Sequence, residues 1–509
     1  MGGQQNLFDP VPSDRLSVLS HADLLEFAIL QQKANEQMFQ EVLRLRALKN
    51  ELEQKTFLFE DRFIVLKNKF FGKSSEKEPG KPDDSRPKVV APKRRKVQLP
   101  SERYPDAPRI ERHVEFAEAP DCTLCGTQLE DSGMTENAEY LTVIPKEYIV
   151  VQQKRHKYRC KTCHGDLVTA PSPPRIKEGS AYSDEMMIDA AMTKYCDLIP
   201  MERYSQMADR SGVPGLPPQS LIECSHYVAD FIKPAHDLIK KETLAEKVLQ
   251  ADETPHRMLE GDETSHWHLW GFSSTTASYF EAHDTRSGDV ASRILADSDC
   301  EFLVSDVFSG YARAVREANE IRVGNHKPSI QNIYCNAHSR RRFKEAQDHF
   351  PEPAKFFIDS YKEIYRLEGE ATDKPADQVL QLRSQMRPLF DAMKAKCIEL
   401  LPMYPTKSSV GKAFGYLLRN FNELTEFIAN PLLPIDNNRQ ERLLRNPVIG
   451  RKTWYGTHSR RGAETMAILF SVVETCKLNN VNPREYLTRL ICDLHQGKNP
   501  YTPATFKSL

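Results

Sequence analysis

Apolar residues recur at helical spacing over a long stretch near the start of the chain. Residues 20–71 contain almost no Gly or Pro, and apolar side chains return every seven residues. The repeat consists of Met38, Leu45, Leu52, Phe59 and Leu66. The companion positions are mixed and include Val42, Lys49, Thr56, Phe63 and Phe70. The pattern predicts a long helix that self-associates as a coiled coil, and the alternative is a helix packed inside its own domain.

The pattern changes three times over the next part of the chain. Residues 72–100 are rich in Lys, Pro and Ser and poor in large apolar side chains, which predicts a basic flexible linker. In residues 101–170, apolar and polar side chains alternate at 140–144 and 148–151, which predicts strands in a small β-rich module. Residues 175–245 return to helical spacing around a Gly-containing turn, which predicts a helix-turn-helix-like DNA-binding segment.

Residues 246–450 show strand patterns for the first time in close succession. Three strands, a helix and two further strands are predicted, and that order is typical of a ribonuclease H-like core, a mixed sheet with helices on its faces. Residues 343–430 look helical throughout and are interpreted as an insertion into this core. Residues 451–509 form a basic C-terminal region. The predicted fold class is therefore a multidomain α+β protein.

Length and composition fit this division. A chain of 509 residues exceeds what one hydrophobic core usually organises, and 39% apolar with 28% charged residues is ordinary for folded protein. The 70 basic and 71 acidic side chains nearly cancel, so any nucleic-acid contact must come from local patches. The sequence has no apolar run near the roughly 18 to 20 residues that span a bilayer, and its polar start indicates a cytoplasmic protein without a membrane partner.

Four of the eleven cysteines stand in two Cys-x-x-Cys pairs, Cys122 with Cys125 and Cys160 with Cys163. Two thiolates at this spacing can turn onto one ion, so the pairs predict one structural Zn²⁺ with four ligands and no open position for chemistry. The alternative is two unrelated buried cysteine pairs. His164 could replace one thiolate, but it is the poorer candidate.

Two aspartates follow apolar strand patterns in the predicted core. Asp252 ends the strand VLQAD and Asp306 ends the strand FLVSD. Neighbouring strands would bring the two carboxylates together, as two-metal phosphodiester chemistry requires. Taken singly, each Asp could equally be a turn residue or a helix cap.

Motifs over nearly the full length resemble the insertion-sequence-66 family of DDE transposases. The matching segments are Phe70-Phe71-Gly72-Lys73-Ser74-Ser75-Glu76-Lys77, the Cys-x-x-Cys pairs, Lys194-Tyr195, Ile199-Pro200-Met201-Glu202-Arg203, Ala251-Asp252-Glu253-Thr254-Pro255, Asp306-x-x-x-Gly310-Tyr311, Cys335-Asn336-Ala337-His338-Ser339-Arg340-Arg341, Pro434-Ile435-Asp436-Asn437-Asn438-x-x-Glu441-Arg442, Gly450-Arg451-Lys452-x-Trp454 and Glu474-Thr475-Cys476-Lys477-Leu478-Asn479. One departure is Asn336, where the family usually has Trp, and it puts local packing in doubt.

The resemblance implies that Asp252, Asp306 and Glu441 form the catalytic triad and hold two Mg²⁺ or Mn²⁺ ions. From the residues alone, Glu441 could instead belong to a capping box with Asn438 and pair with Arg445 at i,i+4. Glu253 is a weaker metal ligand, because adjacent strand residues point to opposite faces. Asp436 is the main competitor for the third acid.

Basic residues near these motifs are candidates for DNA binding. His338, Arg340, Arg341 and Arg342 would lie beside the active site, where guanidinium groups can hold phosphates. We assign the same role to Arg442, Arg445, Arg451 and Lys452. The alternative is a core-facing His and a solvated helix face. Cys335-x-x-His338 has no second ligand pair nearby in sequence, so a second zinc site is not expected.

The predicted function is a DNA transposase of a prokaryotic, DNA-associated kind, which cleaves strands at the terminal inverted repeats of its element and joins them to target DNA. One alternative is a catalytically silent zinc DNA-binding regulator derived from a transposase. Another is a metal-dependent nuclease that cuts without rejoining. The expected partners are double-stranded DNA, a second copy through the N-terminal helix and, as the family implies, companion proteins encoded by the element.

Overall fold

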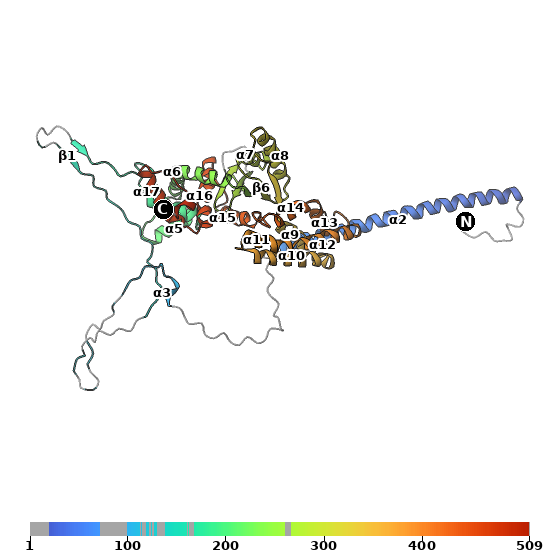
Figure 1. The fold of residues 1–509 in the computed structure, drawn as a ribbon, viewed down its shortest axis with the longest axis horizontal. Coiled ribbons are helices and arrows are strands. Elements are labelled where there is room, and N and C mark those ends of the chain that lie inside the picture. The colour runs from blue at the N-terminus through green and yellow to red at the C-terminus, as the bar shows by residue number, and fades with distance from the viewer. Residues whose placement is uncertain are drawn as a thin grey trace, which may run out of the picture. The chain divides into compact units, whose positions relative to one another are not determined.

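The computed structural model describes residues 20–71, 99–111, 113, 119–121, 124, 127–129, 138–159, 161, 167–259 and 266–507 (Figure 1). The chain divides into two compact units. Unit 1 consists of Met1–Lys73, Arg155–Gln206 and Gly215–Leu509, and unit 2 consists of Ser74–Lys154 and Met207–Pro214. This division differs from the domains predicted from sequence, which remain a prediction.

Unit 1 contains a mixed five-stranded sheet in the order β5-β4-β3-β6-β7. The strands are β3 (Val248–Arg257), β4 (His266–Ser273), β5 (Ser278–His283), β6 (Phe302–Ser305) and β7 (Gln331–Tyr334). β3, β4 and β5 are antiparallel neighbours, whereas β6 and β7 run parallel to β3. The mixed sheet and the order of three strands, a helix and two strands are confirmed, and α8 (Ser309–Gly324), between β6 and β7, was not predicted.

Helices cover both faces of this sheet. On one face, α7 (Gly288–Asp297) and α8 pack against alternate residues such as Leu249, Ala251 and Leu303. On the other face, Val304 and Ile333 belong to a large core made with the helices that follow β7. Those elements are α9 (Asn336–Ala346), α10 (Pro351–Ala371), α11 (Ala376–Ser384), α12 (Arg387–Leu400), η1 (Leu401–Met403), α13 (Ser409–Arg419), α14 (Phe421–Thr425) and η2 (Glu426–Ile428).

Further helices are α4 (Asp184–Tyr195), α5 (Met201–Arg210), α6 (Pro218–Leu244), α15 (Asn438–Trp454), α16 (Arg460–Leu478), α17 (Pro483–His495) and α18 (Pro503–Phe506). Of these, α6 and α16 contact β5, and α15 contacts β3 and β4. The last residues of α5 belong to unit 2. The backbone N–H groups of Ser278 and Phe280, on the edge strand β5, donate to Thr475 Oγ1 at 3.0 Å and Ser471 Oγ at 2.9 Å. α16 therefore closes an edge that would otherwise present unpaired donors. α15 continues across residue 450, where the sequence had predicted a boundary.

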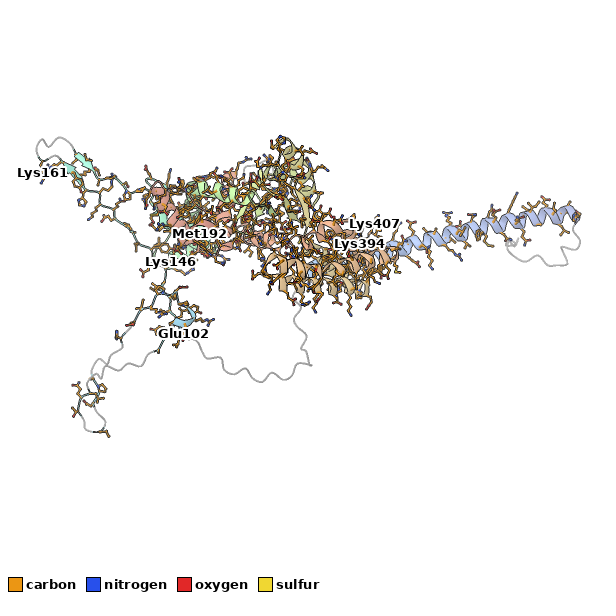
Figure 2. All side chains as sticks on the ribbon, viewed as in Figure 1. Glu102, Lys146, Lys161, Met192, Lys394 and Lys407 are labelled. Atoms are coloured by element: carbon orange, nitrogen blue, oxygen red, sulfur yellow. The ribbon has the colours of Figure 1, made fainter. Side chains whose placement is uncertain are left out.

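The predicted N-terminal helix is present as α2 (His21–Phe71). Its described side chains are exposed on every side through its first half (Figure 2). Near its end, Asp61 is 2% exposed and accepts hydrogen bonds from the Ser409 backbone N–H and hydroxyl, each at 2.6 Å. Phe57 packs against the rings of His349 and Phe350. The end of α2 is therefore bound within unit 1 to the first turn of α13 and the chain before α10.

The predicted coiled-coil positions lie away from this contact. The five heptad residues that begin with Met38 and end with Leu66 are between 49% and 71% exposed. The intramolecular contact uses Phe57 and Asp61 instead, so it leaves the heptad face available. Self-association remains a prediction.

The predicted strands at 140–144 and 148–151 are wrong. These residues have no regular secondary structure, and side chains such as Val143 and Val150 are 80% and 100% exposed. Alternation favours a strand only when a neighbouring strand supplies the hydrogen bonds. Within the described residues of 101–170, the regular strands are β1 (Lys157–Arg159) and β2 (Leu167–Thr169), which pair antiparallel in unit 1, and α3 (Pro100–Arg103) is a short helix of unit 2.

The four cysteines predicted to bind zinc, Cys122, Cys125, Cys160 and Cys163, lie outside the described residues, so the zinc module remains a prediction. None of the helices in the described ranges is long and apolar enough to cross a membrane.

Candidate functional site

The parallel strands bring three chemically active side chains into one row. The last pairs of the two parallel ladders are Gln250↔Val304 and Ser305↔Tyr334. Asp252 and Asp306 each lie two residues after the first of these pairs. Asp306 and Cys335 each lie one residue after the second. The backbone N–H of Cys335 donates to Ser305 O at 3.1 Å, so the register continues to this level. Asp252, Asp306 and Cys335 therefore lie side by side across β3, β6 and β7.

The row lies on the sheet face covered by α9–α15. Side chains two residues apart in a strand share a face, so Asp306 and Cys335 share the face of Val304 and Ile333, which belong to the core under α9–α13. The prediction that a strand ends at Asp252 is wrong, because β3 continues to Arg257, paired with β4. What ends near Asp252 is the parallel pairing with β6.

Hydrogen bonds fix the start of α15 over this row. Gln250 Nε2 donates to Asp436 O at 2.9 Å, and Asn437 Nδ2 donates to Ala251 O at 2.8 Å. The Asn437 backbone N–H donates to Cys335 Sγ at 3.2 Å. The chain before α15 is thus attached to β3 and to the end of β7, and Glu441 follows in the first turn of the helix.

Electrostatics shows that the three predicted acids share one environment. The pKa of Asp252 is raised to about 8, first by burial and then by the negative charges of Glu253, Asp306 and Glu441. A carboxyl group with several like charges nearby resists ionisation unless cations neutralise the site. Asp252 Oδ1 and Asp306 Oδ1 each accept one backbone N–H, from Glu253 and Phe308, both at 3.0 Å.

The expected capping box at Glu441 is not formed. The N-cap of α15 is Asn437, whose side chain makes no capping bond, and Asn438 Nδ2 donates to Asp436 Oδ2 at 2.5 Å. The expected pairing of Glu441 with Arg445 is also replaced. Among the described residues, the ion-pair contacts of Glu441 are His338 Nε2 at 3.8 Å and Arg341 Nη2 at 3.9 Å. Glu441 is therefore turned toward α9 and not along its own helix.

The two competing acids are held by other partners. Asp436 accepts from Tyr365 Oη at 3.1 Å and from the backbone and side chain of Asn438. Glu253 accepts from Arg286 Nε at 2.8 Å and from Tyr311 Oη at 2.7 Å. These partners of Glu253 lie on the α7–α8 side of the sheet, as strand alternation predicts.

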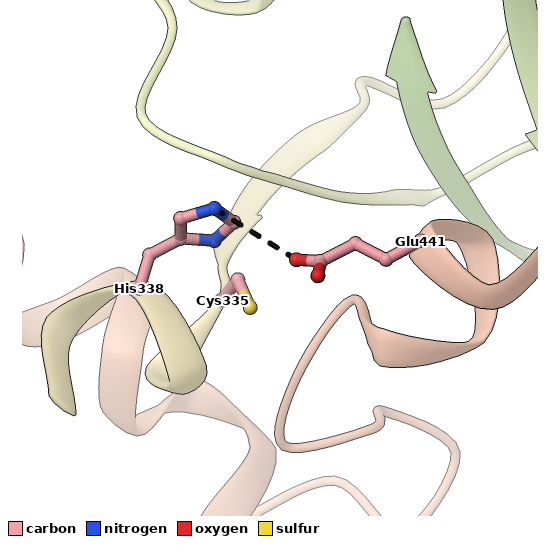
Figure 3. Close-up of side chains that lie close together, drawn as sticks. All are labelled: Cys335, His338 and Glu441. Atoms are coloured by element: carbon pink, nitrogen blue, oxygen red, sulfur yellow. Dashed lines mark ion pairs between the residues drawn. The ribbon is translucent and has the colours of Figure 1, made fainter. Parts of the chain in front are cut away.

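His338 and Cys335 converge on Glu441 from the start of α9. The potential ligand atoms of Cys335, His338 and Glu441 all lie within 4.8 Å of one another (Figure 3). Asp252 and Asp306 are not part of that group. The sequence interpretation dismissed Cys335-x-x-His338 because no second ligand pair is nearby in the chain. Its third donor comes from α15, far along the sequence, and no local spacing could have revealed it.

One further residue of the site was missed from sequence, and the packing of another was left in doubt. Gly271 pairs with Asp252 across β3 and β4, and a Cβ atom there would lie 2.1 Å from Gln440 Nε2 of α15. A Gly inside a strand often marks such a close approach, which was the available signal. Asn336, the departure from the family pattern, is fully buried and donates through Nδ2 to the carbonyls of Leu424 and Ile435 at 2.9 and 3.1 Å. Its polar group is thus satisfied.

The predicted DNA-binding residues divide into two groups. Arg340 and Arg341 lie on α9, Arg341 beside Glu441, and Arg442 and Arg445 are exposed on the first turns of α15. Arg342 of α9 lies over the Tyr416 ring at 4.3 Å.

Arg451 and Lys452 lie near the end of α15, roughly 15 Å further along the helix axis than Glu441. Arg451 Nη1 contacts Thr254 Oγ1 at 3.4 Å, and burial lowers its pKa, whereas Lys452 is exposed.

Comparison with known proteins points to one family. A family profile described as "Transposase IS66 family" matches residues 179–465, a range that includes the sheet, the row of side chains and Glu441. Three uncharacterized proteins of Sinorhizobium fredii (strain NBRC 101917 / NGR234) are similar over most of their length. They are y4hP, 25% identical over 75% of this chain and 72% of that protein; y4jD, 25% identical over 75% and 76%; and y4qI, 27% identical over 76% and 73%.

Proposed function

The chain belongs to the IS66 family of transposases, and we propose that it is an active DDE transposase whose triad is Asp252, Asp306 and Glu441. The observation that carries this proposal is the shared environment of the three acids. They come from two parallel strands and a helix start. The pKa of Asp252 is raised to about 8, first by burial and then by the charges of Glu253, Asp306 and Glu441. Glu253, by contrast, is paired with Arg286 on the opposite face of the sheet.

The residues present fit a site for hard divalent cations. Carboxylate oxygens are the donors that Mg²⁺ and Mn²⁺ prefer. Glu441 Oε1 is buried and has no hydrogen-bond partner in the described structure, which is costly unless an ion occupies its lone pairs. Asp252, Asp306 and Glu441 would hold two such ions, whose chemistry when bound is activation of the attacking oxygen and stabilisation of the leaving oxygen.

We interpret the sheet as a ribonuclease H-like core. Three antiparallel strands followed by two parallel strands, with helices on both faces, support this interpretation. The role of the core is to hold Asp252 and Asp306 at equal depth on adjacent strands, while the bonds from Gln250 and Asn437 fix the helix that carries Glu441. Placement by strands and backbone bonds keeps the acids in position when DNA enters.

Basic side chains beside the acids would orient the DNA. Arg341 lies 3.9 Å from Glu441, and His338 lies 3.8 Å from it, so a phosphate at the acids would meet the guanidinium group of Arg341 and the imidazole of His338. Arg340, Arg442, Arg445, Arg451 and Lys452 would extend the contact along α9 and α15, since phosphate contacts fix register without reading sequence. The proposed DNA substrates are the terminal inverted repeats and the target duplex.

We further propose a structural Zn²⁺ at Cys122, Cys125, Cys160 and Cys163, self-association through α2, and action on DNA in a prokaryotic cytoplasm with companion proteins of the element. The zinc proposal rests on the two Cys-x-x-Cys pairs. Combined Cys122→Ser and Cys160→Ser substitutions should lower the zinc content by one ion per chain. A double variant that keeps its full zinc content would rule the site out.

The test of the function is the product formed from labelled DNA that carries an element end. Incubation with Mg²⁺ or Mn²⁺ should give a free 3′-hydroxyl at the end and then joined products with a target plasmid, and chelator should stop both. Cleavage without joining would make the chain a nuclease. Binding without cleavage would make it a silent regulator.

A further inference from the structure

Cys335, His338 and Glu441 carry a second kind of chemistry within the same face of the sheet. We infer that these three side chains form a binding site for a transition-metal ion such as Zn²⁺. We also infer that an ion bound there draws Glu441 away from the triad. Their donor atoms are a sulfur, an imidazole nitrogen and a carboxylate oxygen, within 4.8 Å of one another. That donor set favours Zn²⁺ or Co²⁺ over Mg²⁺.

The fold holds the three side chains together from two rigid elements. Cys335 is the N-cap residue of α9, and His338 lies in the first turn of that helix, so both face the same side of its N-terminal end. Glu441 reaches them from the first turn of α15, where its carboxylate faces the His338 ring and Cys335 lies close to both (Figure 3). The backbone bond from Asn437 to Cys335 Sγ ties the two helix starts to each other at 3.2 Å.

Two polar atoms of these side chains lack a hydrogen bond among the described residues. His338 Nδ1 and Glu441 Oε1 are both buried without a hydrogen bond in the described structure. Buried polar atoms are nearly always satisfied, and each exception needs an explanation. A metal ion would satisfy both atoms. The two side chains are 27% and 28% exposed, so an ion can reach the site from solvent.

Burial raises the pKa of the Cys335 thiol to about 12 in the metal-free chain, so a bound ion would have to displace its proton. The side chain is fully buried, and its sulfur accepts the backbone N–H of Asn437. The N-terminal end of a helix also stabilises negative charge, and Cys335 occupies the N-cap of α9. With three protein donors the ion would keep an open coordination position, which water or the neighbouring Asp306 could fill.

A matched control is present in the same sheet. Cys300 is also fully buried, just before β6, where its thiol donates to Phe302 O at 3.1 Å. It belongs to no group of converging ligand atoms in the described residues. Cys300→Ser therefore removes a buried thiol of the same sheet without touching the proposed site.

The binding test measures Co²⁺ bound by the full chain. Cys335→Ser and His338→Asn should each bind one Co²⁺ fewer than the wild type. The thiolate-to-cobalt absorption should also be weaker in Cys335→Ser, because one cysteine ligand is lost. Cys300→Ser should match the wild type in both measurements. The four cysteines of the predicted zinc module are unchanged in every variant, so they cancel. His338→Asn decides the matter if Cys335→Ser does not fold. Unchanged Co²⁺ content in the folded variants would overturn the inference.

The consequence for activity rests on the proposed function, because it assumes that Glu441 is the third acid. Zn²⁺ should inhibit Mg²⁺-dependent cleavage by the wild type and by Cys300→Ser. The activity of each variant is expressed relative to its own activity without Zn²⁺. The Zn²⁺ concentration that halves cleavage should be higher for Cys335→Ser than for the wild type by a factor on the order of 10. Equal inhibition of Cys335→Ser and wild type would reject the competition. The two proposals can also fail separately. If Cys335→Ser and His338→Asn lose Co²⁺ but the wild type does not cleave DNA, the metal site is upheld and the proposed function is rejected.

Discussion

Asp252 combines burial with like charge in a single carboxyl group. In the metal-free folded chain its pKa is about 8, whereas an unfolded Asp has a pKa of about 3.9. The folded state therefore binds more protons between these values, so this residue makes stability fall as pH rises from about 4 to about 8. Divalent cations should reverse the effect, since they neutralise the ionised site.

Asp252→Asn should therefore melt at a higher temperature than the wild type at pH 8 in chelator. The difference in the free energy of unfolding should be on the order of a few kcal/mol at pH 8, and it should vanish near pH 4. Mg²⁺ should raise the melting temperature of the wild type and not that of the variant. Asp297→Asn, at an exposed Asp that ends α7, is the control and should show neither effect. Identical melting temperatures of Asp252→Asn and wild type at pH 8 would show that burial and the neighbouring charges do not raise the pKa of Asp252.

At the scale of elements, the close approach of α15 to β4 sets where Glu441 lies. A methyl group at Gly271 would clash with Gln440 Nε2 at 2.1 Å and with Phe280 at 2.8 Å. Overpacking of this kind costs roughly 1–3 kcal/mol. We expect Gly271→Ala to lower both the melting temperature and the cleavage rate.

Addition of Gln440→Ala should restore part of both losses, because it removes the atom nearest the new methyl group. Melting curves and cleavage rates of the two single variants and the double variant measure this coupling. Unchanged stability of Gly271→Ala would mean that α15 does not pack this closely.

The helix α2 offers a second test at this scale, because its two faces have different roles. Leu45→Glu with Leu52→Glu places charges on the exposed heptad face and should dissociate the assembly, as light scattering would show. Asp61→Ala removes the acceptor of the Ser409 N–H. It should destabilise unit 1 by about 1–3 kcal/mol and leave the assembled mass unchanged. A wild-type chain that is already monomeric would contradict self-association.

The same elements show what sequence could and could not predict. Strand patterns located the sheet, because their period is a local signal, and the apolar runs before Asp252 and Asp306 located these two residues. The strand end predicted at Asp252 was wrong, since the pairing of β3 with β4 beyond it is not a local signal. Glu441 was identified through the family resemblance, since its contacts with α9 join segments that are far apart in the chain. The metal group at Cys335 was missed for the same reason. The strands at 140–151 were predicted wrongly, because no alternation reveals whether a partner strand exists.

At the scale of the whole molecule, DNA contact has to come from local patches. The net charge is −1, so binding depends on clusters such as the one on α9 and α15. Arg340→Ala or Arg341→Ala should weaken binding to all DNA sequences similarly. Each should also reduce the salt dependence by about one phosphate contact, because each contact releases counterions.

Titration of labelled DNA at several salt concentrations measures this slope. Lys362→Ala on α10 is the control, because the substitution also removes one positive charge but lies outside the two basic helices. If the Arg variants keep the wild-type dependence of affinity on salt, DNA does not contact Arg340 or Arg341.

The proposed function depends on three acids that act as one catalytic unit. The most direct measurement is strand cleavage by Asp252→Asn, Asp306→Asn and Glu441→Gln, each of which keeps its shape and loses a charge that the cations need. Each should fall to background with DNA binding intact, while Asp436→Asn should retain cleavage because Asp436 is bonded to Tyr365 and Asn438. Near-normal cleavage by Glu441→Gln, with loss in Asp436→Asn, would move the third acid. Cleavage that survives all three substitutions would contradict the mechanism.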